Sequence, residues 1–233
     1  MAIRGCLVTG TDTGAGKTIV TAALCAAMRA AGERVAAHKP VVTGVGDSPQ
    51  DGEWPRDHEL LAAVTAARPE QVCARTFAPS VSPHLAAELA GVAIELDALV
   101  AAAHDAAARA DVLVVEGVGG LLVPLGEGHC VRDLAVRLGL PLVIAARPGL
   151  GTINHTLLTI EAARAAGLQV RAVVLTPWPE TPTVMQLSNR ETIARLGDVS
   201  VATLAPVAGV GELEDAAAAL PWRAWLGSSA RPR

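Results

Sequence analysis

The chain has 233 residues and a formal net charge of −4, so it is long enough to bury a sizeable core. Hydrophobic residues make up 51% of it but aromatic residues only 2%, which leaves Ala, Val, Leu and Ile to fill that core. The negative net charge gives no electrostatic basis for binding nucleic acid or an anionic membrane surface. We expect one domain over residues 1–227, followed by a flexible tail at 228–233.

The cysteines and the first residues bear on the compartment. Cys6, Cys25, Cys73 and Cys130 are far apart and form no C-x-x-C pair, which argues against a zinc site or a redox motif. The start lacks a basic segment followed by a long apolar run, and no apolar stretch reaches the roughly 18 to 20 residues that span a bilayer. We therefore expect a reduced, cytoplasmic protein that is neither secreted nor membrane-spanning.

The first predicted strand, Ile3 to Val8, leads into a glycine-rich stretch, and an Ala-rich helix is predicted from Ile19 to Ala31. The stretch reads T-G-T-D-T-G-A-G-K-T over residues 9–18. Strand, glycine loop and helix in this order indicate a phosphate-binding loop, whose backbone N–H groups and helix N-terminus face the anion. The pattern G-x-x-x-x-G-K-[ST] is met at residues 16–18 and missed at its first position, where Thr11 stands.

The residue types in this loop suit the handling of phosphate. Gly14 and Gly16 let the backbone approach the anion, and Lys17 supplies a point charge. The hydroxyl of Thr18 is a candidate Mg²⁺ ligand. An ordinary glycine-rich turn before a helix is the alternative, and the flanking strand and helix disfavour it.

Lysine is rare in this chain: there are seventeen arginines and only two lysines, Lys17 and Lys39. The bias can reflect genome base composition, yet it also marks two positions where a compact ammonium is needed. Lys39 ends a predicted strand, Arg34 to Lys39, that Pro40 closes. Ligands of open α/β sheets bind at this strand edge, where the phosphate loop also lies, so Lys39 is a candidate site residue. A solvated lysine at a strand end is the alternative.

Two acidic residues stand at similar positions. After a Gly-, Asp- and Pro-rich loop at 41–55, Asp57 opens a predicted helix to Ala67, either as a first-turn acid or as a metal ligand. Residues 111–115 form a continuous apolar run typical of a central parallel strand, and Glu116 follows it. In a phosphate-loop protein we expect an acid there to hold a metal ion or its water.

Strands and helices alternate through the rest of the chain. Helices are predicted at 83–90, 96–110, 131–138, 153–166, 184–196 and 209–219, and strands at 141–146, 169–175 and 199–204. Residues 73–83 are predicted to be irregular or to form a short extended piece, and residues 118–122 to form a flexible turn. The glycine-rich start at 148–152 is a second candidate anion site. This order predicts an α/β fold with a doubly wound, mostly parallel sheet, in the three layers of P-loop NTPases.

The chain resembles the dethiobiotin synthetases over nearly its whole length. The motifs that carry this resemblance are G-T-D-T-G-A-G-K-T at 10–18, H-K-P-V-V-T-G at 38–44, S-P-H at 82–84, V-E-G-V-G-G-L-L-V-P at 115–124 and T-I-N-H-T at 152–156. Many nucleotide-binding proteins share the loop alone. Loop, lysine, acid-glycine and I-N-H segments in this order are specific to the family.

The resemblance implies an ATP- and Mg²⁺-dependent cyclo-ligase of biotin biosynthesis, with 7,8-diaminopelargonate and CO₂ as substrates and dethiobiotin, ADP and phosphate as products. In such enzymes CO₂ carbamates one substrate amine, the carbamate is phosphorylated to a carbamic-phosphoric anhydride, and the second amine attacks it. The resemblance also implies a homodimer with the substrate site at its interface. Because the substrate supplies its own nucleophiles, such a protein mainly positions groups and neutralises developing charge.

The resemblance assigns roles to individual residues. Lys39 would be the catalytic residue, bridging the carbamate and the γ-phosphate. The nucleotide would contact Asp12, Thr13, Gly14, Ala15, Gly16, Lys17, Thr18, Glu116, Gly119, Thr176, Pro206 and Val207. The diamine substrate would contact Thr43, Gly119, Gly151, Thr152 and Asn154. Mg²⁺ would be held, directly or through water, by Thr18, Asp57 and Glu116, with Asp51 as a rival to Asp57.

Two observations bear on specificity. Family members often carry Asn where Thr176 stands, and a single hydroxyl lacks the paired donor and acceptor of an amide, so the nucleobase preference stays open.

The competing class is the nucleotide-switched ATPases of cell division and plasmid partition, which carry a lysine five residues before the loop lysine. Asp12 stands at that position, and the chain has no basic or amphipathic tail, which argues against this class. Other phosphate-loop amide ligases and kinases are a further alternative.

Overall fold

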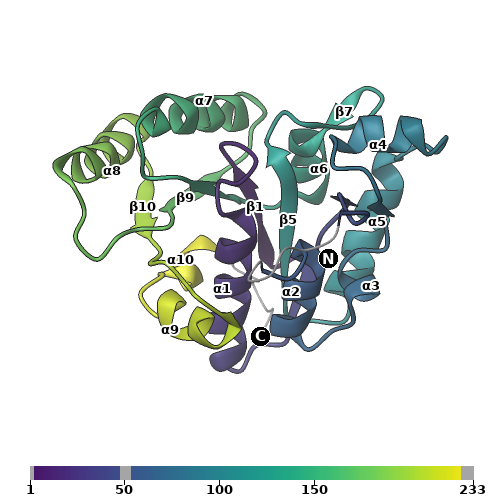
Figure 1. Ribbon diagram of the computed structural model, residues 1–233, viewed down its shortest axis with the longest axis horizontal. Helices are drawn as coiled ribbons and strands as arrows, with labels where there is room; N and C mark the ends of the chain where they lie inside the picture. Colours follow the sequence, from purple (N-terminus) through teal and green to yellow (C-terminus); the bar gives the residue numbers. More distant parts are fainter. Residues whose placement is uncertain (1–2, 48–53, 227–233) are drawn as a thin grey trace, which may run out of the picture.

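Six parallel strands form the central sheet of the computed structural model, which describes residues 3–47 and 54–226 (Figure 1). Across the sheet the strands are β10 (Ser200–Thr203), β9 (Val170–Leu175), β8 (Leu142–Ala146), β1 (Gly5–Gly10), β5 (Val112–Gly120) and β2 (Val35–His38). The strand order reverses beside β1, which lies between β8 and β5. The structure therefore confirms the predicted doubly wound sheet and places the strand before the phosphate loop at its centre.

The strand register brings distant candidate residues to one edge. Val8 of β1 pairs with Glu116 of β5, and His38 of β2 pairs with Val115. Lys39 follows His38 directly, so it leaves its strand beside Glu116. Because all three strands are parallel, the phosphate loop after β1 begins at the same edge.

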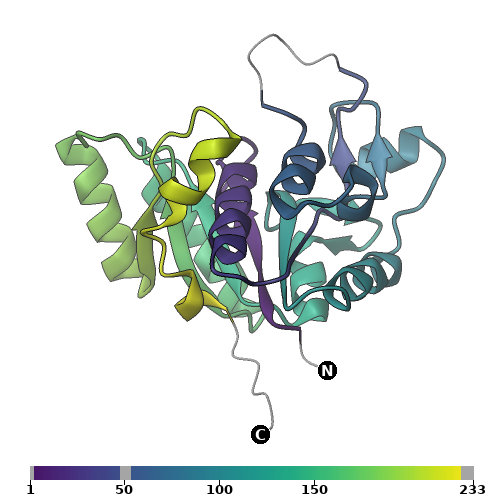
Figure 2. The ribbon, with the colours of Figure 1, turned by 90° about the horizontal axis from the view of Figure 1, so that it is seen from below.

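Helices cover both faces of the sheet (Figures 1 and 2). One face carries α1 (Lys17–Ala30), α2 (Asp57–Thr65), α9 (Leu213–Ala217) and α10 (Trp222–Trp225). The other carries α5 (Leu96–Ala107), α6 (Val131–Leu138), α7 (Thr152–Ala165) and α8 (Val184–Gly197). Side chains alternate along β1 accordingly, with Cys6 and Val8 in the first core and Leu7 in the second.

Helix α1 shows how sequence spacing builds this core. Val20, Leu24 and Met28 recur every fourth residue and are fully buried, since that spacing places them on one helix face. Five of the other eleven positions are alanine, which favours the helix and lets it lie close to the sheet. None of the helices within 3–47 and 54–226 has the length and apolar composition needed to cross a bilayer.

Several short elements were missed by the sequence analysis. They are strand β3 (Val42–Thr43), helix α3 (Pro69–Val72), the hairpin β6 (Pro124–Gly126) and β7 (His129–Cys130), and α10. The parallel partner of β3, β4 (Thr76–Phe77), lies in the segment that was expected to be irregular or a short extended piece. Helix α4 (Pro83–Leu89) was expected. Elements of two to four residues are too short to show a periodicity, so nothing in the local pattern indicates them.

Two expectations need correction, and one lies outside the described residues. The predicted flexible turn at 118–122 is shorter than expected, because β5 continues to Gly120 and pairs there with Gly10, and only Leu121 and Leu122 form a turn. The predicted helix at 209–219 is divided into a 3₁₀ turn, Val210–Glu212, and the short α9. The predicted tail at 228–233 lies outside the described residues.

His38 makes stability depend on pH. Burial lowers the pKa of this histidine from 6.5 to about 4, and its Nε2 is buried without a hydrogen-bond partner among the described residues. Between these values the unfolded chain binds a proton that the folded chain does not. The free energy of unfolding should therefore fall as pH drops from about 6.5 to 4, by about 3 kcal/mol from this residue.

Urea unfolding of the wild type and His38→Gln between pH 4 and 7 tests this prediction. The variant should lose that part of the pH dependence, because an amide does not titrate. His104→Gln, which changes an exposed histidine of α5, is the matched control and should keep the wild-type slope. Equal slopes for the wild type and His38→Gln would contradict the prediction.

Candidate active site

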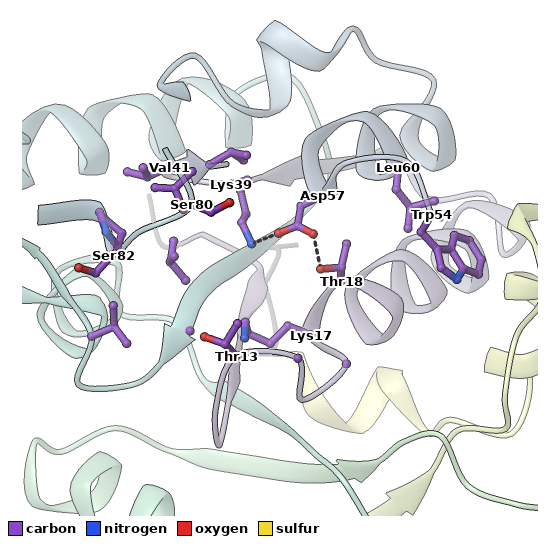
Figure 3. Close-up of a pocket in the computed structure, with 18 of the residues that line it drawn as sticks. Thr13, Lys17, Thr18, Lys39, Val41, Trp54, Asp57, Leu60, Ser80 and Ser82 are labelled. Atoms are coloured by element: carbon purple, nitrogen blue, oxygen red, sulfur yellow. Dashed lines mark hydrogen bonds and ion pairs between the residues drawn. The ribbon is translucent and has the colours of Figure 1, made fainter. Parts of the chain in front are cut away.

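A cleft of about 700 Å³ opens at the carboxyl ends of β1, β2 and β5 (Figure 3). The phosphate loop and the start of α1 form one wall, through residues that include Gly14, Lys17 and Thr18. The opposite wall comes from the β3–β4 region and the turn before α4, with Thr43 and Ser82 among its residues. The cleft therefore joins the phosphate loop to the end of β2, where Lys39 lies.

The phosphate loop has the geometry of an anion site. Gly16 is the N-cap of α1 and has φ +88°, a left-handed conformation that favours glycine. A Cβ at Gly16 would also lie 2.5 Å from Cγ2 of Thr176. Among the described residues no side chain caps α1, and its first turn carries no acid. The N–H groups at this helix start are thus available to an anion.

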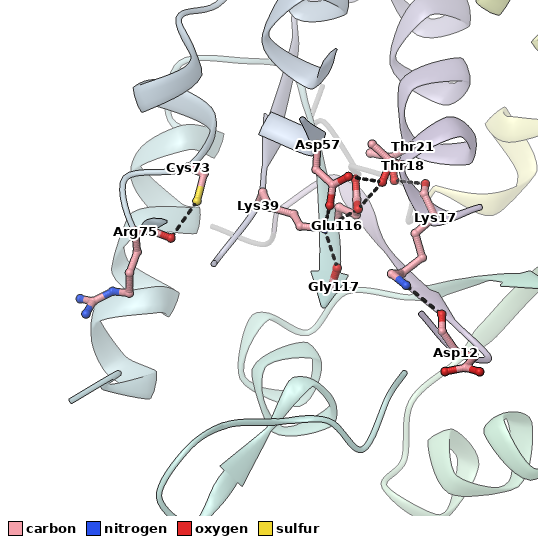
Figure 4. Close-up of polar contacts among 10 residues, drawn as sticks. All are labelled: Asp12, Lys17, Thr18, Thr21, Lys39, Asp57, Cys73, Arg75, Glu116 and Gly117. Carbon is pink, nitrogen blue, oxygen red and sulfur yellow. Dashed lines mark hydrogen bonds and ion pairs between the residues drawn. The ribbon is translucent and has the colours of Figure 1, made fainter. Parts of the chain in front are cut away.

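Lys17 lies over the loop and is 7% exposed. Its Nζ donates to the backbone oxygen of Asp12 at 3.0 Å, which folds the side chain back along the loop (Figure 4). Burial, together with the nearby charge of Lys39, lowers the pKa of Lys17 to about 8. A polyphosphate placed beside Lys17 would favour its charged form.

Lys39 is the most enclosed cation of the cleft, at 3% exposure. Its Nζ donates to Glu116 Oε1 at 2.5 Å, to Asp57 Oδ2 at 2.7 Å and to the backbone oxygen of Gly117 at 3.2 Å (Figure 4). Burial alone would lower the pKa of Lys39, but the charges of Glu116 and Asp57 outweigh it and raise the pKa. Lys39 is therefore held as an ammonium ion.

Three oxygen-bearing side chains meet next to Lys39. The hydroxyl of Thr18 lies 2.8 Å from Asp57 Oδ1 and 2.9 Å from Glu116 Oε1. Burial raises the pKa of Glu116, which is fully enclosed. Burial would also raise the pKa of Asp57, but the charge of Lys39 outweighs it and lowers the pKa. The two carboxylates share one cation but lie in different environments.

These oxygens fit a magnesium ion. Carboxylate and hydroxyl oxygens are ligands that Mg²⁺ accepts, and Oε2 of Glu116 is buried with no hydrogen-bond partner among the described residues. Within 3–47 and 54–226 no group of three or more His, Cys, Asp or Glu side chains could hold a metal ion. A metal ion at this site would thus depend on further oxygens, such as those of a phosphate. Asp51, the rival to Asp57, lies outside the described residues.

The structure divides the predicted site residues into two groups. Lys17, Thr18, Lys39, Asp57 and Glu116 come together at one point. Thr13, Thr43 and Gly119 also line the cleft, which Gly151, Thr152, Asn154, Pro206 and Val207 do not. Thr176 is buried next to the loop, and its methyl group faces Gly16.

The start of α7 repeats the construction of the start of α1. Its N-cap, Gly151, has φ +89°, and neither a side-chain cap nor a first-turn acid is present among the described residues. The hydroxyls of Thr152 and Thr156 lie 3.5 Å apart within this helix. This helix start, which was predicted as a second candidate anion site, stands outside the main cleft.

Sequence reasoning missed three residues around the cleft. Trp54 and Ser80 line it, and the hydroxyl of Ser80 donates to the carboxylate of Asp47. Arg147 donates to the backbone oxygens of Thr13 and Gly14 in the phosphate loop. No local motif contains these residues, so only their spatial neighbours identify them.

Comparison with known proteins identifies the family of this chain. The family model described as an AAA domain matches residues 4–211. A protein of Anaeromyxobacter sp. (strain Fw109-5) is 45% identical over 84% of this chain and 91% of its own length, and one of Mycobacterium sp. (strain KMS) is 40% identical over 89% and 90%. A Rhodococcus erythropolis (strain PR4 / NBRC 100887) protein is 37% identical over 96% of both chains. All three are named ATP-dependent dethiobiotin synthetase BioD. The chain belongs to the dethiobiotin synthetase family.

Proposed function

We propose that this chain is an ATP- and Mg²⁺-dependent cyclo-ligase that closes a ureido ring on 7,8-diaminopelargonate with CO₂, giving dethiobiotin, ADP and phosphate. The observation that carries the proposal is the buried Lys39 ammonium, held beside Glu116 at the mouth of the phosphate loop. The relatives' names support the same reaction. The reaction would pass through a carbamate and a carbamic-phosphoric anhydride.

The nucleotide would bind with its phosphates on the loop. The uncapped start of α1 would supply N–H groups, and Lys17, which lines the cleft, would supply a cation to the β- and γ-phosphates. Its lowered pKa is consistent with a group that awaits a negative ligand. Pro206, Val207 and Thr176 would lie around the base. Since Thr176 offers one hydroxyl, other nucleoside triphosphates are candidate donors.

Magnesium would be held by Thr18, Asp57 and Glu116, directly or through water. When bound, the ion would neutralise charge on the transferred phosphoryl group. The unpartnered Oε2 of Glu116 supports this assignment, because a buried carboxylate oxygen without a donor is rare. Lys39 donates to both of these carboxylates, so its ammonium would lie beside the ion and next to the reacting anions.

Lys39 would act by charge and position. Because its pKa is raised, it is a poor general base, and its ammonium is suited to bridging two anions. The anions in this reaction are the carbamate and the γ-phosphate. Thr43 and Gly119 line the cleft near this point and would contact the carbamate end of the substrate. No protein nucleophile is needed, since the substrate's second amine attacks the anhydride.

The carboxylate end of the substrate would bind at the start of α7 in a partner subunit. Gly151, Thr152 and Asn154 form this helix start, which lies outside the main cleft of its own chain. Two large apolar side chains here are exposed, Leu150 at 93% and Leu158 at 55%. Exposed apolar residues next to an unpaired anion site support a homodimer in which each chain completes the other's substrate site.

The most direct test is to identify the product. The protein, diaminopelargonate, bicarbonate and Mg²⁺ are mixed with ATP, CTP, GTP or UTP, and products are analysed by mass spectrometry. We expect dethiobiotin, with phosphate release that depends on both diaminopelargonate and bicarbonate. Rapid hydrolysis without either substrate, stimulated by DNA or lipid, would instead favour a nucleotide-switched ATPase.

Substitutions of the two lysines should impair different steps of the reaction. Lys39→Gln should keep ATP binding but reduce turnover about 10²- to 10³-fold, because it removes a cation from the reacting anions. Lys17→Gln should mainly weaken ATP binding, because it removes the cation over the phosphate loop. Calorimetry and steady-state rates separate these effects, and circular dichroism checks the fold. Full ring-closing activity of Lys39→Gln would remove Lys39 from the mechanism.

The carboxylates should set the magnesium requirement. Glu116→Gln and Asp57→Asn should each raise the Mg²⁺ concentration for half-maximal activity about tenfold or more, because each removes a charged oxygen near the ion. Asp105→Asn, an exposed change on α5, is the matched control and should leave it unchanged. A wild-type magnesium dependence in both site variants would place the ion elsewhere.

A further inference from the structure

An arginine that directly follows a neighbouring strand contacts the backbone of the phosphate loop. Arg147 is the first residue after β8, and β8 pairs with β1 so that Ala145 lies opposite Gly10. Its Nη2 donates to the backbone oxygen of Thr13 at 3.0 Å, and its Nε donates to that of Gly14 at 3.1 Å. One planar guanidinium thus binds two successive carbonyls of the loop.

Binding these carbonyls also orients the amides behind them. In a planar trans peptide the N–H points opposite to the C=O of the same unit. The carbonyl of Thr13 shares its peptide with the N–H of Gly14, and the carbonyl of Gly14 shares its peptide with the N–H of Ala15. With both oxygens turned to Arg147, these two N–H groups must point away from it.

Glycine at position 14 is part of the same arrangement. Gly14 has φ +68°, and a Cβ there would come within 3.1 Å of Nη2 of Arg147. A side chain would therefore press on the guanidinium as well as strain the backbone. The motif position that lets phosphate approach the loop from inside also lets the arginine approach it from outside.

Arg147 has a rigid base although its guanidinium is exposed. The backbone N–H of Thr176 donates to the oxygen of Ala146 at 2.9 Å, immediately before the arginine. Directly after it, the buried Asn189 of α8 donates from Nδ2 to the oxygens of Pro148 and Gly149 at 3.0 and 3.2 Å. The turn is thus fixed on both sides, which reduces the entropy cost of holding the guanidinium on the loop.

We propose that Arg147 is a positioning residue for phosphate binding: its guanidinium holds the Thr13 and Gly14 carbonyls so that the Gly14 and Ala15 amides are preset for the anion. It acts through the loop and does not touch the reacting atoms. The proposal rests on the proposed use of this loop to bind a nucleoside triphosphate, but not on ring closure.

Binding of magnesium-ATP and of magnesium tripolyphosphate, measured by calorimetry, tests the proposal without turnover. Arg147→Gln should weaken both probes about tenfold and by the same factor, because the preset amides contact phosphate and not the base. Its melting temperature should stay at the wild-type value, since the side chain is exposed. Arg195→Gln, an exposed change in the last turn of α8, is the matched control and should bind both probes normally.

Arg147→Lys separates geometry from charge. It keeps the positive charge but cannot donate to both carbonyls from one planar group, so we expect it to stay at least severalfold weaker than the wild type. Wild-type affinity in Arg147→Lys would mean that positive charge alone suffices for phosphate binding. Wild-type affinity in Arg147→Gln would mean that Arg147 does not position the loop for phosphate. Either result overturns the proposal. If the wild-type chain binds neither probe, the proposed function fails and this inference fails with it.

Discussion

The buried ammonium of Lys39 between Glu116 and Asp57 is the interaction on which the rest of the site depends. Two carboxylates this close, one of them fully enclosed, repel each other unless a cation lies between them. A buried ion pair contributes little to stability by itself, so we propose that this one serves the reaction by holding both charges in place.

The fold supplies this arrangement through register. Parallel pairing places the ends of β1 and β2 on either side of Glu116, which lies within β5. Backbone pairing therefore brings the phosphate loop, Glu116 and Lys39 close to each other, and their side chains then make direct contacts. Strand pairing also positions Arg147, which follows β8 on the other side of β1 and donates from there to the backbone of the loop.

The N-termini of two helices, α1 and α7, have the same construction. Both α1 and α7 begin at a left-handed glycine without a side-chain cap among the described residues, so each leaves backbone donors for an anion. In the proposed reaction one receives phosphate and the other a carboxylate. Because α7 stands outside the main cleft of its own chain, a symmetric partner is the simplest way to bring the two anion sites to one substrate.

The sequence by itself determined the alternation of strands and helices, the phosphate loop, and the suspicion that Lys39 and Glu116 share an edge. These follow from local spacing and from where each polar residue ends an apolar run, as in β5. Only the tertiary structure decided that Lys39 stays charged between two acids and that Arg147 holds a loop 133 positions away. Sheet order and burial set those contacts, and neither leaves a periodic signal in the chain.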